Sequence, residues 1–246
     1  MKQPHILCSE GDLAERAIVV GDPARVERIA QQLENPQEVA YNREFKSMKG
    51  SFQGKEIAVM STGIGGPSTA IAIEEMIKTG VKNIIRVGSC GSMQDSVEIG
   101  DVVIPDGIVR AEGTTTGYVP KPYPASATPD LFIALRDAAE NSGAKFHTGT
   151  TLTIDSLYAE STEDRKSDWA DDGVLVQEME GATVLTVSKL RGAKAGAVFL
   201  VVNAVNETDI EQGIGKYTNQ SVGKTGDLIE KEAQAIMIAL EAITKI

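Results

Sequence analysis

The stretch Ala17-Ile18-Val19-Val20-Gly21-Asp22-Pro23-Ala24-Arg25 sets the fold class of this chain. Its first four residues are apolar and predict a buried strand. A turn at Gly21-Asp22-Pro23 follows, and a helix is expected from there through Leu33. A buried strand that leads straight into a helix is the unit from which α/β proteins are built.

The rest of the chain repeats this alternation of strands and helices. Strands are predicted at Glu38–Lys49, Ser51–Thr62, Asn83–Val87, Asp101–Ile104, Lys145–Ile154, Val174–Val176 and Ala197–Val202, the first two as an antiparallel pair around Lys49-Gly50. Helices are predicted at Pro67–Thr79, Pro129–Asn141 and Gly181–Leu190. A last helix carries one apolar stripe, from which Lys231, Glu232 and Glu241 are absent: Ile229, Ala233, Ile236, Met237, Leu240 and Ile243. We therefore expect an α/β fold, a single-domain three-layer αβα sandwich over residues 1–246 with a mixed central sheet.

Composition excludes several classes of protein. The 246 residues include 24 basic and 35 acidic side chains, a net charge of −11, which argues against nucleic-acid binding. The two cysteines, Cys8 and Cys90, are too few for a disulfide framework and lack metal-site spacing. There is no apolar run of membrane-spanning length and no secretory signal at the N-terminus, so no membrane partner and a cytoplasmic location are expected.

Glycine-rich turns after the predicted strands are candidate ligand loops. In the first, Gly21 and Arg25 suit an anion, since a helix N-terminus and a guanidinium both attract one. Taken alone, this motif favours a plain strand–turn–helix junction with a solvated arginine. The second, Ser61-Thr62-Gly63-Ile64-Gly65-Gly66-Pro67-Ser68, is neither a P-loop nor a dinucleotide fingerprint.

Charged residues inside apolar strands point to the same region. Arg86, in Ile85-Arg86-Val87-Gly88-Ser89-Cys90-Gly91, needs either a site or an ion-pair partner, and Ser89 offers a hydroxyl to an oxyanion. Glu178 and Glu180 end a strand and begin a helix, where they suit sugar hydroxyls or simple capping of the helix. His5 and His147 are the only histidines, and neither forms a Ser-His-Asp arrangement.

The ordered series of motifs resembles a family, the trimer-of-dimers nucleoside phosphorylases that include uridine, hexameric purine nucleoside and methylthioadenosine phosphorylases. It consists of His5, then Gly-Asp-Pro-Ala-Arg, Asn-Arg-Glu-Phe, Ser-Thr-Gly-Ile-Gly-Gly-Pro-Ser, Arg-Val-Gly-Ser-Cys-Gly and Glu-Met-Glu, and it covers almost the whole chain. The resemblance implies an enzyme, a pentosyltransferase in which phosphate attacks C1′ of a nucleoside and gives free base and (deoxy)ribose 1-phosphate. It also implies a homo-oligomer, at least a dimer and expected to be a hexamer, with no cofactor besides inorganic phosphate as co-substrate.

The resemblance assigns roles residue by residue. The phosphate site maps to Gly21, Arg25, Arg86 and Ser89, with Arg43 from a neighbouring subunit. The nucleoside site maps to Met179 and Glu180 at the ribose with Glu178 beside them, His5 from the neighbour at the 5′-hydroxyl, and Cys90, Gly91 and Tyr158 along the base. Arg86, Glu180 and Asn203 are the residues implied in catalysis. A monovalent cation, K⁺, maps to Glu44, Ile64 and Ser68.

The base stays open at this stage. Ser61–Glu75 and Val109–Gly113 look closest to uridine enzymes, yet the segment that reads uracil there is replaced by the shorter Asp155–Glu160. The aspartate of purine enzymes is missing, because Val202-Asn203-Ala204 stands in its place and leaves Asn203, Asn206 or the more remote Asp209 to face the base. We expect a uridine-type enzyme ahead of a purine or methylthioadenosine type, with a hydrolytic nucleosidase and a non-catalytic nucleoside-binding protein as alternatives. The charged run Glu160–Asp172 is expected to be a solvated lid or helix.

Overall fold

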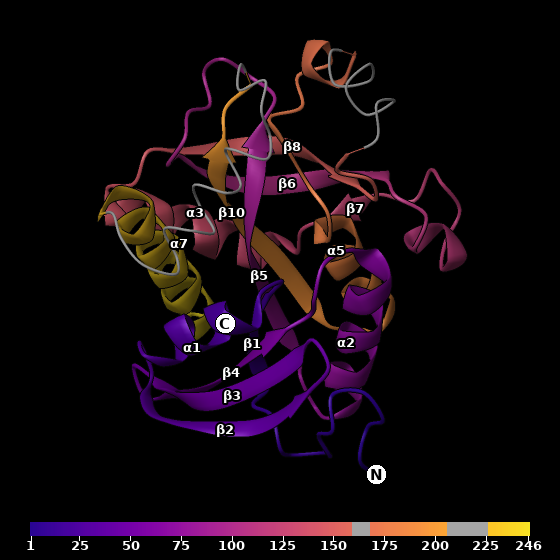
Figure 1. Ribbon diagram of the computed structural model, residues 1–246, viewed down its shortest axis with the longest axis vertical. Helices are drawn as coiled ribbons and strands as arrows, with labels where there is room; N and C mark the ends of the chain where they lie inside the picture. Colours follow the sequence, from indigo (N-terminus) through magenta and orange to yellow (C-terminus); the bar gives the residue numbers. More distant parts are fainter. Residues whose placement is uncertain (159–167, 206–225) are drawn as a thin grey trace.

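The computed structural model describes residues 1–158, 168–205 and 226–246, and Figure 1 shows its arrangement. Asn206, Asp209 and residues 160–167 of the expected lid lie outside the described residues. The strands are β1 (Arg16–Val20), β2 (Glu34–Asn42), β3 (Phe45–Phe52), β4 (Lys55–Ser61), β5 (Asn83–Ser92), β6 (Val102–Ala111), β7 (Ala125–Ser126), β8 (Phe146–Ile154), β9 (Val176–Glu178) and β10 (Lys194–Asn203). The helices are α1 (Pro23–Ala30), α2 (Gly66–Lys78), α3 (Pro129–Ser142), α5 (Gly181–Leu190), α7 (Gly226–Thr244) and the short 3₁₀ turn Thr115–Gly117.

The described strands form one mixed sheet in the order β10-β6-β8-β9-β5-β1-β4-β3-β2. Strands β4, β1, β5 and β10 run parallel in neighbouring pairs, whereas β2, β3 and β4 form an antiparallel meander. Because β10 pairs with both β5 and β6, the strands β5, β9, β8, β6 and β10 close on themselves as a barrel. The predicted α/β class is confirmed, with a sheet more strongly curved than a flat sandwich would have.

Helices cover both faces of the sheet. Helices α2 and α5 pack together on one face, over a core that includes Ile73, Met76 and Phe199. Helices α1, α3 and α7 cover the other face, over a second core that includes Ile85 and Leu240. In this three-layer arrangement, parallel strands β1, β5 and β10 place their carboxyl ends at one edge of the fold, where ligands of such sheets bind.

The N-terminal strand–turn–helix unit forms as its sequence predicts. Residues 17–20 of β1 are fully buried, Asp22 accepts a hydrogen bond from the Ala24 amide at 2.8 Å, and Pro23 begins α1. Helix α1 ends at Ala30, three residues before the predicted end at Leu33. Capping by Asp22 therefore fixes where the chain leaves β1 and enters α1.

The predicted strand pair around Lys49-Gly50 is wrong, because this region forms three strands. Gly50 lies inside β3 opposite Ile57, where a Cβ atom would come within 2.8 Å of the Glu34 carbonyl oxygen. The glycine permits a close approach of two chain segments and makes no turn. The turns lie instead at 43–44 and 53–54, where Arg43 and Gln53 adopt the left-handed conformation with φ of 54° and 49°.

The apolar stripe predicted for the last helix is also wrong in part. Ile229 is 40% exposed and Ala233 is exposed, whereas Glu232, placed outside the stripe, is only 4% exposed. The buried face of α7 is rotated so that a carboxylate enters the protein interior. Glu232 is buried there because it pairs with two arginines of α1, Arg25 and Arg28.

Other boundaries shift without changing the topology. Strand β5 continues from Val87 to Ser92, and β6 continues from Ile104 to Ala111, so residues expected in loops belong to the sheet. Strand β9 is displaced by two residues and carries Glu178 at its end.

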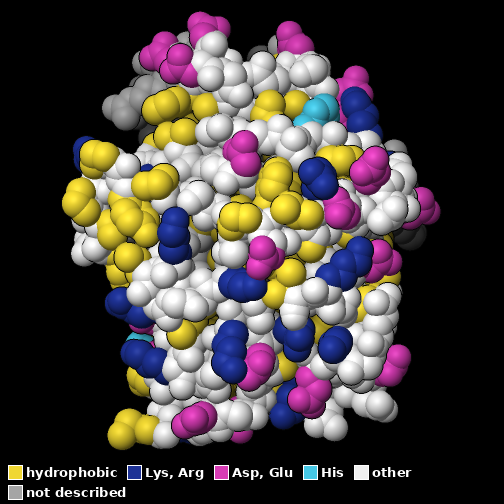
Figure 2. All heavy atoms as spheres, turned by 180° about the vertical axis from the view of Figure 1, so that it is seen from behind, with side chains coloured by type: hydrophobic (Ala, Val, Ile, Leu, Met, Phe, Trp, Pro, Cys, Tyr) yellow, Lys and Arg dark blue, Asp and Glu magenta, His cyan; other side chains and the backbone are white. Residues whose placement is uncertain are grey.

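On the face shown in Figure 2, Lys and Arg side chains lie among Asp and Glu side chains, which is unlike the basic surface of a nucleic-acid-binding protein. None of the described helices is long and apolar enough to cross a membrane.

Candidate active site

A cavity of about 670 Å³ lies at the carboxyl ends of β1, β5 and β10. It has the size of a small-molecule site. Its walls combine glycine backbone, apolar side chains and charged groups, and comprise Gly21, Asp22, Pro23, Arg25, Arg28, Glu44, Gly63, Ile64, Arg86, Ser89, Cys90, Gly91, Ile154, Leu157, Gln177, Glu178, Met179, Glu180, Val202 and Asn203.

Two arginines of α1 border the cavity, and one buried carboxylate holds both. The Arg25 Nε atom lies 2.5 Å from Glu232 Oε1, and Arg25 Nη1 donates to the Val87 carbonyl at 3.4 Å. Arg28, one turn further along α1, donates from Nε to Glu232 Oε2 at 2.9 Å. Since Glu232 does not itself line the cavity, it acts from behind and fixes the direction of the guanidinium groups.

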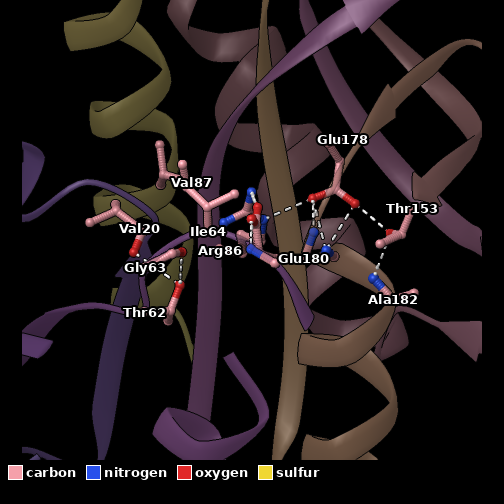
Figure 3. A network of polar contacts seen from close by, with 12 residues as sticks. Val20, Thr62, Gly63, Ile64, Arg86, Val87, Thr153, Glu178, Glu180 and Ala182 are labelled. Carbon is pink, nitrogen blue, oxygen red and sulfur yellow. Dashed lines mark hydrogen bonds and ion pairs between the residues drawn. The ribbon is translucent and has the colours of Figure 1, made fainter. Parts of the chain in front are cut away.

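The third arginine, Arg86 on β5, bridges two carboxylates, Glu178 at the end of β9 and Glu180 at the start of α5 (Figure 3). Its Nε lies 3.1 Å from Glu178 Oε2, and its Nη2 donates to Glu180 Oε2. All three side chains are at most 6% exposed. The Arg86 Nη1 atom is buried and has no hydrogen-bond partner among the described residues. The cost of a guanidinium inside an apolar strand is therefore offset by ion pairs within the site.

Glu178 and Glu180 have different surroundings. Glu178 accepts hydrogen bonds from the amides of Glu180 at 2.9 Å and Gly181 at 2.8 Å, and from the Thr153 hydroxyl (Figure 3). It therefore caps α5 and its oxygens are occupied by the protein. Glu180 accepts only from Arg86 and from the Gly65 amide at 2.5 Å, among the contacts described, so it is the carboxylate with room for a ligand.

Burial controls the protonation of the groups in the cavity. It raises the pKa of Glu180, an effect that Arg86 opposes and the neighbouring Glu178 reinforces. Burial also raises the pKa of the Cys90 thiol well above its usual value, and Cys90 Sγ donates to the Leu200 carbonyl at 3.4 Å. Cys90 is therefore a neutral wall residue and no thiolate nucleophile.

The glycine-rich loop after β4 forms part of the cavity wall through Gly63 and Ile64. The Thr62 and Gly63 amides donate to the carbonyls of Val20 and Gly21. The Thr62 hydroxyl also donates to the Val20 carbonyl at 3.2 Å (Figure 3), so this loop is tied to the loop after β1. Gly63 has φ of 72°, and a Cβ there would lie 2.8 Å from Glu44 Cγ. The backbone can then turn so that the Gly65 amide reaches Glu180.

The cavity gathers most of the residues expected from the sequence: Gly21, Arg25, Arg86, Ser89, Cys90, Gly91, Glu178, Met179, Glu180 and Asn203 all line it, as do Glu44 and Ile64 of the expected cation site. Four expected residues do not line it. Arg43 is exposed in the β2–β3 turn, Tyr158 is 71% exposed, and Ser68 donates to the Ile64 carbonyl at 3.2 Å. His5 is held away from the cavity by Glu75.

His5 is fixed on the surface of α2. Its Nδ1 lies 2.6 Å from Glu75 Oε1, and the backbone amides of His5 and Ile6 both donate to Glu75 Oε2 at 3.0 Å. Burial of Glu75 raises its pKa, but His5 and the two amides outweigh that effect and lower it. The expected roles of His5 and Arg43 in a neighbouring subunit's site stay predictions.

Sequence reasoning missed three residues. Arg28 and Gln177 line the cavity, and Glu232 orients the α1 arginines. The spacing of Arg25 and Arg28, one helical turn apart, could have indicated a shared partner. Among the described residues, no cluster of His, Cys, Asp and Glu side chains is arranged to hold a metal ion.

Comparison with known proteins identifies the family. The model of the Phosphorylase superfamily matches residues 15–243. A guanosine phosphorylase of Halorubrum lacusprofundi is 39% identical over 99% of this chain and 98% of its own, and a uridine phosphorylase of Thermococcus kodakarensis is 38% identical over 98% and 85%. The crystal structure of uridine phosphorylase from Vibrio fischeri superposes with a TM-score of 0.90 at 33% identity, over 100% of this chain and 98% of that one. The chain belongs to the phosphorylase superfamily.

Proposed function

We propose that this protein cleaves the N-glycosidic bond of a nucleoside with inorganic phosphate and gives free base and (deoxy)ribose 1-phosphate, as a uridine phosphorylase does. One observation carries the proposal. Arg25 and Arg86 border the same cavity as Glu180, a buried carboxylate whose hydrogen-bonding capacity the described protein groups use only in part. Cations and a carboxylate acceptor in one pocket suit a phosphate and a diol together.

Phosphate would occupy the end of the cavity bounded by Gly21, Arg25, Arg86 and Ser89. Guanidinium groups bind phosphate through paired N–H donors, and the N-terminus of α1 adds partial positive charge. Glu180 would accept hydrogen bonds from the sugar hydroxyls beside Met179. Because Arg86 bonds to Glu180, the same side chain would link the phosphate to the sugar.

The reaction would be a displacement at C1′ through a transition state of oxocarbenium character. Phosphate supplies the nucleophilic oxygen, the C1′–N bond breaks, and the base leaves with the electron pair. The protein would contribute orientation and charge stabilisation rather than a covalent intermediate. This fits a cavity whose one thiol, Cys90, is held neutral.

A purine or methylthioadenosine phosphorylase is the second candidate, since a guanosine phosphorylase is among the similar proteins. A hydrolytic nucleosidase is a third, because all three arginines are already paired with carboxylates.

Incubation with uridine, inosine, guanosine, adenosine and methylthioadenosine, each with and without phosphate, tests the proposal. We expect base release only with phosphate, and its loss in Arg25→Ala. The matched control, Arg136→Ala, removes an exposed arginine of α3 and should leave the rate unchanged. Equal release without phosphate would replace phosphorolysis by hydrolysis, and no release with any substrate would favour a non-catalytic binding protein.

The working unit we propose is a homo-oligomer, a dimer at least and a hexamer by analogy, located in the cytoplasm. Arg43 and His5 do not line the cavity of their own chain, which supports their contribution to a neighbour's. K⁺ between subunits fits Glu44, the Ile64 carbonyl and the Ser68 hydroxyl, since oxygen donors suit such an ion. No further cofactor enters the proposal. Sedimentation with Arg43→Ala as a comparison would test the assembly.

A further inference from the structure

Three neighbouring strands place two carboxamides on either side of a glycine. In the sheet, Asn203 of β10 is in register with Gly91 of β5, and Gly91 is in register with Gln177 of β9. A Cβ atom on Gly91 would lie 3.9 Å from Asn203 Cβ and 3.9 Å from Gln177 Cγ. The two amide side chains therefore rise from the same face, about 9–10 Å apart at their Cα atoms, with bare backbone between them.

This amide slot, defined as Asn203, Gly91 and Gln177, lies in the wall of the cavity. Ile154, Leu157 and Val202 supply apolar surface to the same cavity, as a flat ring requires. Gly91 follows Arg86 by five residues along β5, roughly 16 Å of extended strand. Ser89, which would also contact phosphate, precedes Gly91 by only two residues, so the slot adjoins the phosphate-binding residues along β5, as a nucleoside whose C1′ meets phosphate requires.

Both amides are buried, and their oxygens lack partners within the described part of the chain. Gln177 and Asn203 are each 7% exposed, and neither Gln177 Oε1 nor Asn203 Oδ1 has a hydrogen-bond partner among the described residues. A buried polar group without a partner costs about 1–3 kcal/mol, so such groups are usually satisfied by a ligand or by water. A carboxamide can present its oxygen or its NH₂ group by rotating, so each can pair with a ring N–H or a carbonyl oxygen.

Charge decides which bases suit the slot. The ionisable side chains of Asp, Glu and Arg that line the cavity are Asp22, Arg25 and Arg28 after β1, Glu44 in the β2–β3 turn, and the paired Arg86, Glu178 and Glu180. Within the slot the hydrogen-bonding groups are neutral, so they offer N–H donors but no strong acid to protonate a leaving base. Such donors stabilise a leaving base best when its negative charge develops on a carbonyl oxygen.

We propose that Gln177 is a specificity-determining residue, and that Gln177 and Asn203 together select bases with a lactam group, O=C–N–H, over bases that carry an amino group instead. This inference rests on the proposed function. Uracil, hypoxanthine and guanine have the lactam, and adenine and cytosine do not. Uridine and guanosine, which appear in the names of the similar proteins, both contain such a base.

The test compares Gln177→Leu and Asn203→Leu with the wild-type protein on uridine, inosine, adenosine and cytidine at saturating phosphate. Each substitution should lower kcat/KM for the lactam nucleosides roughly ten- to hundredfold and leave the KM for phosphate unchanged. Gln32→Leu, which removes an exposed amide outside the cavity, is the matched control. Gly91→Ala should fold normally, since its Cβ meets nothing closer than 3.9 Å, but should block the ring and abolish turnover.

Two results would overturn the inference while phosphorolysis stands: wild-type turnover of adenosine as fast as inosine, or unchanged ratios of kcat/KM in Gln177→Leu. Titration calorimetry with uracil and hypoxanthine needs no turnover and covers the case in which the proposed function fails. Binding of either base that is lost in Gln177→Leu supports the slot, and equal binding by both proteins, or none by the wild type, contradicts it.

Discussion

Replacing each of the two adjacent carboxylates by an amide should separate structure from chemistry. In Glu178→Gln, the amide must place its NH₂ group among donors, because both oxygens of Glu178 accept hydrogen bonds, from Arg86, two backbone amides and the Thr153 hydroxyl. At least one bond turns into a clash between donors, and the ion pair with Arg86 is lost. Breaking a buried pair of this kind costs about 3–5 kcal/mol.

Glu180→Gln should behave differently. Its amide oxygen can still accept from the Gly65 amide, although its NH₂ group then faces Arg86 and that ion pair is lost. Because burial already disfavours the ionised form and Glu180 accepts fewer protein hydrogen bonds than Glu178, the loss of stability should be smaller, about 1–3 kcal/mol. Catalysis should suffer more, with kcat/KM about a hundredfold lower or worse, because a charged acceptor for the sugar hydroxyls is gone.

Thermal unfolding and steady-state kinetics on both variants provide the assay. At about 2–4 °C per kcal/mol for a chain of this size, Glu178→Gln should lower Tm by roughly 6–20 °C, and Glu180→Gln by a few degrees. The reasoning would be refuted if Glu178→Gln melted like the wild type, or if Glu180→Gln were the less stable variant and kept its activity.

Three further predictions concern charge. Glu232→Gln should raise the KM for phosphate about tenfold with little change in the KM for nucleoside, because Arg25 loses the carboxylate that orients it. Glu241→Gln on the same helix is the control and should alter neither KM. Equal effects of both substitutions would argue against a specific role of Glu232. The acid limb of kcat/KM for nucleoside should lie above the ordinary glutamate pKa of 4.5, since the raised pKa of Glu180 protonates it at higher pH, and an acid limb below 4.5 would be inconsistent with this environment. Glu75 has a lowered pKa, so its stabilising contribution is present above the unfolded value of 4.5 and is lost as pH falls through its folded value. Glu75→Gln should therefore lower the free energy of unfolding by about 1–3 kcal/mol at pH 7 and speed hydrogen exchange at the Ile6 amide. Urea unfolding and hydrogen-exchange measurements check these two effects.

The elements that local physics determines were predictable from the sequence. Strand β1 follows from its apolar run and α1 from Asp22 and Pro23, because burial and capping act over a few residues. Arg86 within an apolar strand required a partner, and the structure supplies Glu178 and Glu180. Such an argument predicts that a partner exists but does not identify it.

What depends on tertiary contact could not be predicted in the same way. Gly50 looks like a turn residue, yet it lies mid-strand because Glu34 passes close to it. Glu232 lies outside the predicted apolar stripe, yet it is buried because it forms ion pairs with Arg25 and Arg28 of α1. Gln177 became a candidate only when the register of β9, β5 and β10 placed it across Gly91 from Asn203.

The most direct test of the central claim is ³¹P NMR of inorganic phosphate during cleavage of uridine and inosine. We predict that one phosphate is converted to a sugar 1-phosphate ester for every base released, and that Arg86→Lys abolishes this conversion. Base released while the inorganic phosphate signal stays constant would contradict the account.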